Sequence, residues 1–388
     1  MTSWRAILAA GLLISVAAAC SDDGSSAGDT TVAVETSAPD TTLASETTAD
    51  DISESTAPET TAAQEPEWEA VTAPADCMCS DGSEFTYFVR KADPAKVVFY
   101  LEGGGACFDV GTCGPGSSAY KATVGDGPDG RTTGVFDFGD PRNPFDGWSI
   151  VYVPYCTGDV HIGNLTKDYG DGVVIEHKGY VNGSTALNAM AELFPDATEL
   201  VVTGESAGSV PTPLYAGLAS DLLPDARITV LADGSGAYPD IPGINAVIGG
   251  NWGTMNAVPD WPENAGMTAE TWSFPGLFIQ AWKHAPDITF ARHDYAFDET
   301  QAFFSGLAGI PADDLVSLID KNEAQIEAAG VDLFSYISPG DSHTVLGRPE
   351  FYTDTQNDLA FVDWVTALVA GEPVADNHCN TTANGCKA

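Results

Sequence analysis

Short apolar runs rich in Val, Ile, Leu and Phe alternate along this chain with longer stretches of helical periodicity. The apolar runs predict strands at 97–101, 150–153, 199–203, 227–232, 288–292 and 333–337. Helical patterns fall at 183–194, 207–222, 299–307, 312–328 and 355–369. Asp354 is the predicted N-cap of the last helix, and Gly371 is its predicted stop. Because strands and helices alternate, we expect an α/β fold with a mostly parallel central sheet and helices on both faces.

Residues 237–276 depart from this alternation. They are rich in Gly, Pro, Asn and Trp, and they lack a clear period. We interpret them as an irregular insertion over the carboxyl ends of the strands, where α/β sheets bind ligands.

The first 67 residues predict export rather than folded structure. Arg5, an apolar core and three alanines precede Cys20, which indicates a signal peptide at 1–19 and a bacterial lipobox cysteine that becomes lipidated. Residues 21–67 hold 12 acidic residues and no Lys, Arg or aromatic side chain. Such a segment cannot bury enough apolar area to fold, so 20–67 is predicted to be a lipidation site followed by a disordered tether. The protein is then a cell-surface lipoprotein or a secreted protein, with its folded domain at 68–388.

Acidic residues dominate the whole chain, whose net charge is −41. The part from Trp68 onward has 44 acidic and 14 basic residues, a net charge of −30. This balance excludes nucleic acid as a partner, because phosphate binding requires Lys and Arg. No Asp run matches a calcium loop, and Cys77-Met-Cys79 has no second cysteine pair at zinc-ligand spacing. We therefore expect no metal.

The cysteine count fits an exported protein with disulfides. Removing Cys20 from the eight cysteines leaves seven, so one remains unpaired in the chain. Close spacing predicts two local disulfides, Cys107–Cys113 and Cys379–Cys386.

The segment Gly204-Glu-Ser206-Ala-Gly208 carries the main chemical signal. It follows an apolar strand and precedes a helical pattern, which is the context of the nucleophile turn in α/β-hydrolases. About a hundred residues upstream, the strand 97–101 runs into a loop that contains Gly103, Gly104 and Gly105. Glycine lets backbone N–H groups approach a reacting carbonyl closely, so this loop is a candidate oxyanion loop. The two motifs in this order predict a serine hydrolase.

A serine nucleophile needs a histidine base and an acid, in the chain order serine, acid, histidine. Four histidines follow Ser206: His284, His293, His343 and His378. His343 lies in a polar turn just after strand 333–337, where this fold carries its base. For the acid, Asp233, Asp294 and Asp298 each lie at or near a strand end, and spacing alone leaves Asp294 and Asp298 unseparated.

Several further motifs resemble those of the pectin acetylesterase/Notum family of carboxylesterases, over nearly the whole folded part. The matching segments are Cys79-Ser-Asp-Gly-Ser83, Leu101–Cys107 with Cys113, Tyr155-Cys156-Thr-Gly-Asp, Gly204–Gly208, Phe297-Asp298-Glu-Thr-Gln301 and Ser342-His343-Thr344. The resemblance implies an α/β-hydrolase fold and no cofactor.

Carried over residue by residue, the resemblance implies a catalytic triad of Ser206, Asp298 and His343. It implies an oxyanion hole formed by Gly104, Gly105 and the N–H of Ala207. It also implies a Cys79–Cys156 disulfide, which leaves Cys77 as the odd cysteine. If strand geometry persists through Phe297, Asp294 lies about 13 Å below Asp298, too far to bond the same imidazole.

Two positions depart from the family. Ala106 stands where plant members have tryptophan, and Gly105 stands where the animal Notum members have tryptophan. Both changes remove a large ring beside the reacting carbonyl, so neither an acetyl nor a palmitoleoyl specificity transfers to this chain.

These observations predict an exported serine carboxylesterase that removes an acetyl or other short acyl group from an acylated carbohydrate. Two alternatives remain: an esterase for longer lipid acyl chains, and a non-catalytic surface-binding lipoprotein on a hydrolase scaffold. Membrane contact is expected only through a lipid anchor at Cys20. The sequence makes no prediction of oligomeric state.

Overall fold

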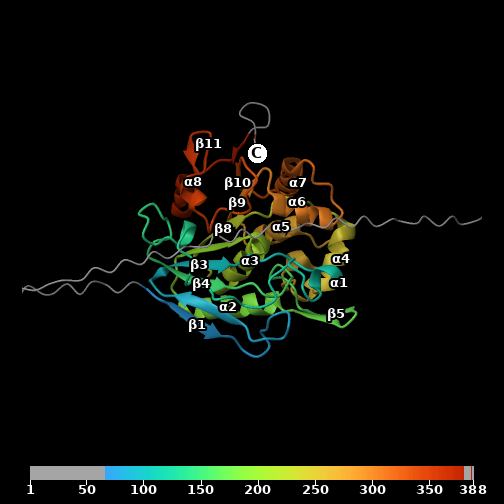
Figure 1. Ribbon diagram of the computed structural model, residues 1–388. Coiled ribbons are helices and arrows are strands. Elements are labelled where there is room, and N and C mark those ends of the chain that lie inside the picture. The colour runs from blue at the N-terminus through green and yellow to red at the C-terminus, as the bar shows by residue number, and fades with distance from the viewer. Residues whose placement is uncertain (1–65, 380–385, 387–388) are drawn as a thin grey trace, which may run out of the picture. The chain divides into compact units, whose positions relative to one another are not determined.

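The computed structural model describes residues 66–379 and Cys386 (Figure 1). The predicted signal peptide, the lipidation site Cys20 and nearly all of the tether lie outside the described residues. None of the helices in the described part combines the length and apolar character needed to cross a membrane.

A nine-stranded sheet forms the centre of the described region. Its order is β1-β2-β4-β3-β7-β8-β9-β10-β13. The strands are β1 Trp68–Thr72, β2 Thr86–Arg90, β3 Asp93–Leu101, β4 Trp148–Val153, β7 Glu199–Glu205, β8 Arg227–Asp233, β9 Thr289–Tyr295, β10 Leu333–Ser338 and β13 Asn377–His378. From β4 to β13 all neighbours pair in parallel, whereas β1 and β2 are antiparallel. The six predicted strands are confirmed; β1, β2 and β13 were not predicted.

Helices cover both faces of this sheet, as predicted. Val202 and its neighbours on alternate strand positions pack against α2 Gly179–Leu193, α3 Thr212–Leu222 and α5 Phe274–His284. Val201 faces the other way, towards α8 Phe361–Ala370 and the short turns η1 Gly134–Phe136 and η5 Pro349–Tyr352. Figure 1 shows α8 in red and α2 in green on opposite sides of the sheet. Burial of both faces explains why these strands are continuous apolar runs.

The region 237–276 is more regular than predicted. It contains α4 Pro242–Trp252 and two short turns, η3 Thr254–Asn256 and η4 Pro262–Asn264. Pro242 occupies the first turn of α4, where its missing N–H costs nothing, and Gly253 ends the helix with φ 68°. The insertion therefore holds a helix that its glycine-rich composition conceals.

The predicted helix 355–369 begins only at Phe361, and Asp354 is not its N-cap. A short hairpin, β11 Thr355–Gln356 and β12 Leu359–Ala360, occupies the first predicted positions. Its turn residues have φ values of 51° and 64°, which Asn and Asp tolerate better than other non-glycine residues. The Asp354 carboxylate accepts a hydrogen bond from Tyr295 Oη at 2.6 Å instead.

Three further helices and a second hairpin lie around this frame. They are α1 Val110–Cys113, α6 Glu299–Leu307, α7 Leu315–Glu327 and the hairpin of β5 Leu165–Gly170 with β6 Val173–His177. The structure contains the disulfides Cys79–Cys156, Cys107–Cys113 and Cys379–Cys386, the same three pairs that the sequence suggests. Cys77 is a buried free thiol.

Candidate active site

Ser206 stands at the sharp turn between β7 and α3, in the conformation that the glycine pattern predicts. Its φ of 55° is unusual for a non-glycine residue and marks local strain. The turn closes against neighbouring backbone: a Cβ at Gly204 would lie 2.4 Å from Gly208 O, and a Cβ at Gly208 would lie 2.0 Å from Leu101 O. Only glycine fits at either position, so the motif residues are required by the geometry of the turn.

An ion pair that the sequence does not reveal anchors this turn. Arg131 Nη2 donates to Glu205 Oε1 at 2.7 Å, and Arg131 Nη1 donates to Tyr152 Oη at 3.0 Å. The guanidinium also lies over the Phe136 ring, 4.5 Å from its centroid. The residue directly before Ser206 is therefore held by a segment 74 positions earlier in the chain. In the sequence, only the acidic side chain of Glu205, at the variable position of the motif, could have suggested this ion pair.

The glycine loop after β3 lies beside this turn. A Cβ at Gly103 would lie 2.9 Å from Ser206 Cβ. The loop is bonded on both sides of Gly105, because Gly104 O accepts from Lys121 N at 2.9 Å and Ala106 N donates to Ala119 O at 3.1 Å. Gly105 has φ 78°. Gly105 and Ala207, two of the three predicted oxyanion residues, line the same pocket as Ser206.

The imidazole of His343 is held by Asp298. His343 Nδ1 lies 2.6 Å from Asp298 Oδ2, and the Asp298 side chain has no exposed surface. Because the carboxylate accepts, Nδ1 is the protonated nitrogen and Nε2 carries the lone pair. His343 Nε2 is buried and makes no hydrogen bond to any described residue, including Ser206. Bonds between a nucleophile and its base are often long before substrate binds.

Asp298 is also the N-cap of α6. Its Oδ1 accepts from Thr300 N and Gln301 N, both at 2.9 Å. Oδ2 accepts from His343 Nδ1 and, at 3.1 Å, from Gln301 Nε2. Four donors therefore surround this buried carboxylate and stabilise its charge.

The two rival carboxylates have other partners. Asp233 Oδ1 accepts from His293 Nδ1 at 2.8 Å, and its Oδ2 accepts from the backbone N–H groups of Val345 and Leu346 at 2.8 and 2.9 Å. Asp233 therefore holds the loop that follows His343. Asp294 Oδ1 accepts from Gly236 N at 2.8 Å. Neither carboxylate hydrogen-bonds to His343.

The expected separation of about 13 Å between Asp294 and Asp298 is wrong. Gln301 Nε2 donates to both carboxylates, at 2.9 and 3.1 Å, so their oxygens are near neighbours. Extended geometry ends at Tyr295, and the chain then folds back as Ala296 N donates to Ser338 O.

The three other histidines after Ser206 lie in separate contacts. His284 Nε2 is 2.8 Å from Asp221 Oδ1, His293 lies against Asp233, and His378 Nε2 bonds with Ser335 Oγ.

Two groups of metal-ligand atoms cluster within the described residues. In the first, Cys107 and Cys113 are joined by a disulfide beside His177. The second comprises Glu323, Asp376 and His378. Neither group includes a residue of the Ser206 site.

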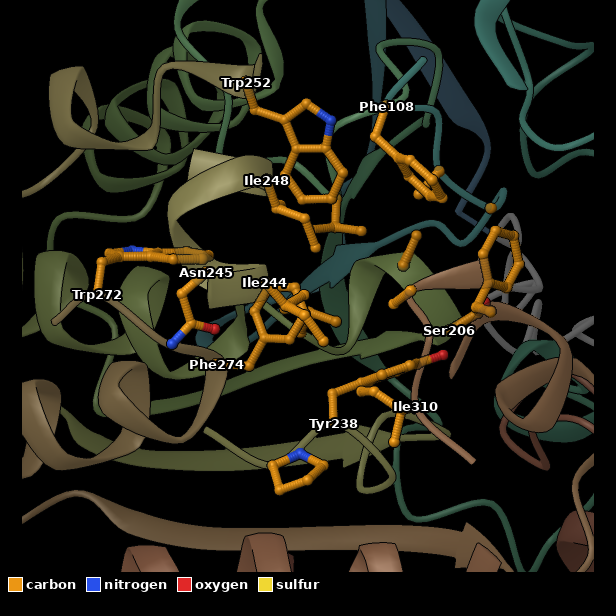
Figure 2. A pocket seen from close by; sticks show the side chains of 18 of the residues that line it. Phe108, Ser206, Tyr238, Ile244, Asn245, Ile248, Trp252, Trp272, Phe274 and Ile310 are labelled. Carbon is orange, nitrogen blue, oxygen red and sulfur yellow. The ribbon is translucent and has the colours of Figure 1, made fainter. Parts of the chain in front are cut away.

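An apolar pocket extends from Ser206. Figure 2 shows Ser206 at one end and Trp272 with Asn245 towards the other. The cavity has a volume of about 80 Å³. One wall comes from the insertion predicted to lie over the strands: Tyr238, Pro239, Ile244, Asn245, Ile248, Trp252, Trp272 and Phe274. The site therefore combines the strained turn at Ser206 with an apolar cavity.

Comparison with known proteins gives the same picture. The pectinacetylesterase family model matches residues 62–248. The palmitoleoyl-protein carboxylesterase notum2 of Xenopus laevis is 29% identical over 140 residues, which cover 34% of this chain and 27% of that relative. The inactive palmitoleoyl-protein carboxylesterase notum1b of Danio rerio is 30% identical over 111 residues, which cover 27% of this chain and 76% of that relative.

The solved structure of the Wnt deacylase Notum from Drosophila superposes with a TM-score of 0.59 at 16% sequence identity. The superposition covers 84% of this chain and 100% of that one, and it shows the α/β-hydrolase fold. The aligned stretch spans only about a quarter of the Xenopus relative's own length. Together, the sheet order, the family match and the relatives show that this chain belongs to the pectin acetylesterase/Notum family of carboxylesterases.

Proposed function

We propose that the protein is an exported serine carboxylesterase in which Ser206, His343 and Asp298 form the catalytic triad. The observation that carries this proposal is the bond from His343 Nδ1 to the buried Asp298, with Nε2 left without a partner. This arrangement presents a basic nitrogen, while Ser206 occupies a strained turn in the wall of the apolar pocket. The disulfides support export, since they persist in oxidising compartments.

In the proposed reaction, Ser206 Oγ attacks the ester carbonyl carbon and its proton passes to His343 Nε2. Backbone N–H groups of Gly104, Gly105 and Ala207 stabilise the negative oxygen of the tetrahedral intermediate. The intermediate collapses, and the alcohol leaves with the proton from Nε2. Water then attacks the acyl-serine by the same steps and releases the carboxylic acid. Throughout, Asp298 holds the imidazole and balances its positive charge.

The pocket supports an acyl chain longer than acetyl, the alternative that the sequence left open. One water molecule needs about 10–15 Å³ of cavity, so a cavity of about 80 Å³ has room for several methylene groups in line. The methyl of an acetyl group would fill only the part nearest Ser206. The half-buried rings of Phe108 and Phe274 line the cavity, and an acyl chain against them would remove more apolar surface from water. We therefore propose a medium-length, unbranched acyl group.

The charge of the domain constrains the alcohol part of the substrate. A net charge of −30 from residue 68 onward repels polyanions at low ionic strength. We propose an ester of a neutral carbohydrate or another uncharged alcohol, rather than of a polyuronate.

A chain-length series of p-nitrophenyl esters with the purified protein tests the acyl proposal. We expect kcat/KM to rise from acetate to an optimum between butyrate and octanoate, and to fall for palmitate. A maximum at acetate with a steady decline afterwards would contradict the role given to the pocket. Each methylene that becomes buried should contribute about 0.8 kcal/mol, which corresponds to roughly a fourfold gain in kcat/KM.

The competing proposal is a non-catalytic binding protein on the same scaffold. One relative bears the name inactive, so family membership alone does not decide. A fluorophosphonate probe distinguishes the two proposals, because it labels only an activated serine. Labelling of the wild type but not of Ser206→Ala would support the esterase; an unlabelled wild type would favour the binding protein.

A further inference from the structure

The side chain of Gln301 lies between two buried carboxylates. Its Nε2 donates to Asp298 Oδ2 at 3.1 Å and to Asp294 Oδ1 at 2.9 Å. Gln301 and Asp298 have no exposed surface, and Asp294 is 1% exposed. A primary amide nitrogen carries two hydrogens, so each carboxylate receives one of them.

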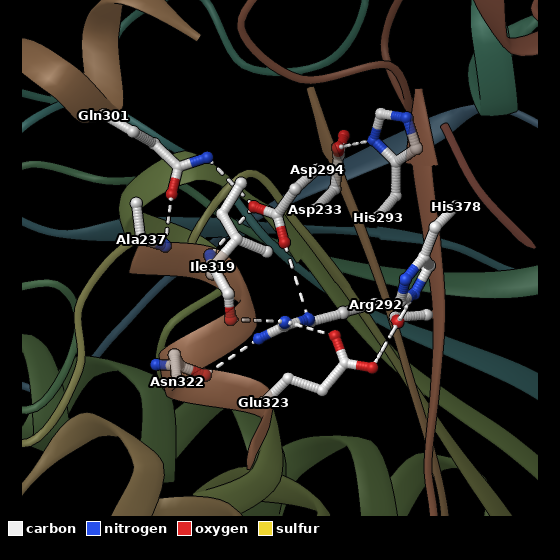
Figure 3. A network of polar contacts seen from close by, with 12 residues as sticks. Asp233, Ala237, Arg292, His293, Asp294, Gln301, Ile319, Asn322, Glu323 and His378 are labelled. Atoms are coloured by element: carbon white, nitrogen blue, oxygen red, sulfur yellow. Dashed lines mark hydrogen bonds and ion pairs between the residues drawn. The ribbon is translucent and has the colours of Figure 1, made fainter. Parts of the chain in front are cut away.

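The orientation of this amide is determined by its third contact. Gln301 Oε1 accepts from Ala237 N at 2.9 Å (Figure 3). Rotating the amide by half a turn would place Oε1 against two carboxylates and Nε2 against an N–H donor. Every one of these contacts would be repulsive, so a single orientation satisfies the site.

Asp294 is itself anchored. Its Oδ1 also accepts from Gly236 N, and its Oδ2 lies 3.5 Å from Arg292 Nε. Arg292 Nη2 also donates to Glu323 Oε2, at 2.8 Å (Figure 3). Burial raises the pKa of Asp294, and the positive charge of Arg292 opposes that rise. The carboxylate of Asp294, to which Gln301 donates, is therefore itself held in place by Gly236 and Arg292.

We propose that Gln301, supported by Asp294, is the positioning residue of the triad acid. Asp298 Oδ1 is occupied by the first N–H groups of α6, so Gln301 Nε2 is the donor that shares Oδ2 with His343. It holds Oδ2 in the direction of Nδ1. Through Ala237 N it also links the acid to the loop that carries Tyr238 into the pocket. This role rests on the proposed function, in which Asp298 is the acid.

Two substitutions and a matched control test the role. Gln301→Leu keeps the volume but removes the donor; we expect kcat to fall about 10- to 100-fold with KM nearly unchanged, as for a lost charge-assisted hydrogen bond. Gln301→Glu keeps an acceptor for Ala237 and can donate only while its carboxyl is protonated. At a pH above the pKa of the new carboxyl group, three carboxylates would lie together and repel one another. The ratio of variant to wild-type kcat/KM should therefore fall as the pH rises.

Ser305→Ala is the control. Ser305 lies on the same helix, is buried, and donates to the carbonyl of Ala237 at 3.4 Å, but has no contact with Asp298. We expect its kcat and its pH profile to match the wild type. A packing role for Gln301 would instead give both of its variants a loss that is the same at every pH, and that result would overturn the proposal.

A measurement without turnover separates this proposal from the proposed function. In ¹⁵N-histidine-labelled protein, the short bond of 2.6 Å should give His343 Nδ1–H a low-field proton signal. Gln301→Leu should move that signal, and Ser305→Ala should not. If the wild type hydrolyses no ester, the proposed function fails while the signal still tests the positioning. A folded Gln301→Leu with wild-type kcat and an unmoved signal refutes the role; if this variant does not fold, the pH series of Gln301→Glu decides.

Discussion

Replacing Asp298 by asparagine should disable the base without unfolding the protein. Asp298 Oδ1 accepts from Thr300 N and Gln301 N at the start of α6, so the amide oxygen of the new side chain must stay there. The amide NH₂ then takes the place of Oδ2 and faces His343 Nδ1. It can only donate, which moves the imidazole proton to Nε2, the nitrogen that must accept the proton of Ser206.

The same change in a serine protease lowers kcat by roughly 10⁴-fold, or about 5.5 kcal/mol of transition-state stabilisation. Asn caps a helix about as well as Asp, but the new NH₂ also faces Gln301 Nε2, so we expect the free energy of unfolding to fall by about 1–3 kcal/mol with the fold retained. Asp294→Asn retains its acceptor for Gly236 N and Gln301 Nε2, and we expect a loss of less than about tenfold. The assay is kcat on the best p-nitrophenyl ester, with urea unfolding as the check on folding.

The outcome can refute the assignment in two ways. If both variants fold and Asp294→Asn shows the larger loss, the acid is Asp294. If both are nearly as active as the wild type, Asp298 has no catalytic role, and the Asp233 carboxylate becomes the candidate.

Two further predictions concern stability. Gly208→Ala would place a Cβ 2.0 Å from Leu101 O, so we expect a loss of about 2 kcal/mol or more in urea unfolding; an unchanged midpoint would show that the turn can relax. Burial lowers the pKa values of His161 and His177 to about 4. A lowered histidine pKa contributes stability that is present above pH ~6.5 and lost towards pH 4, up to about 3 kcal/mol for each residue. Burial raises the pKa of Asp159 to about 6, so its contribution changes oppositely, decreasing as pH rises from ~4 through 6. The urea concentration at the unfolding midpoint of the wild type should decrease as the pH is lowered from 7 to 4.5, and it should decrease less for His177→Gln. An equal decrease in both proteins would contradict the low pKa of His177.

Local motifs were the part of the site that the sequence could predict. The turn at Ser206 depends on Gly204 and Gly208, which are within two residues of it, so its geometry is encoded where it occurs. The strands were also predictable, because both faces of the sheet are buried and each strand is a continuous apolar run.

Contacts between distant segments could not be predicted in this way. Asp294 and Asp298 are four residues apart, and their different partners follow a chain reversal formed with Ser338 and Gly340. Arg131 reaches Glu205 across 74 positions. Spacing along the chain contains no signal for such contacts.

The sequence predicted where the pocket lies but not the helix that forms part of its wall. Residues 237–276 lie where the fold suggests, yet the helix α4 within them shows no amphipathic period. Ile248 and Trp252 both line the cavity, so that helix faces the pocket rather than a sheet. The prediction of Asp354 as an N-cap was wrong because the residues that follow it form a hairpin, whose turn residues have positive φ.

The central claim is that Ser206 is the nucleophile of an esterase. Its most direct test is kcat for wild-type protein and Ser206→Ala on p-nitrophenyl butyrate, with both proteins shown to be folded by urea unfolding. We predict a loss on the order of 10⁴-fold or more for Ser206→Ala, since no other group replaces the attacking oxygen. Equal rates for the two proteins would contradict the claim.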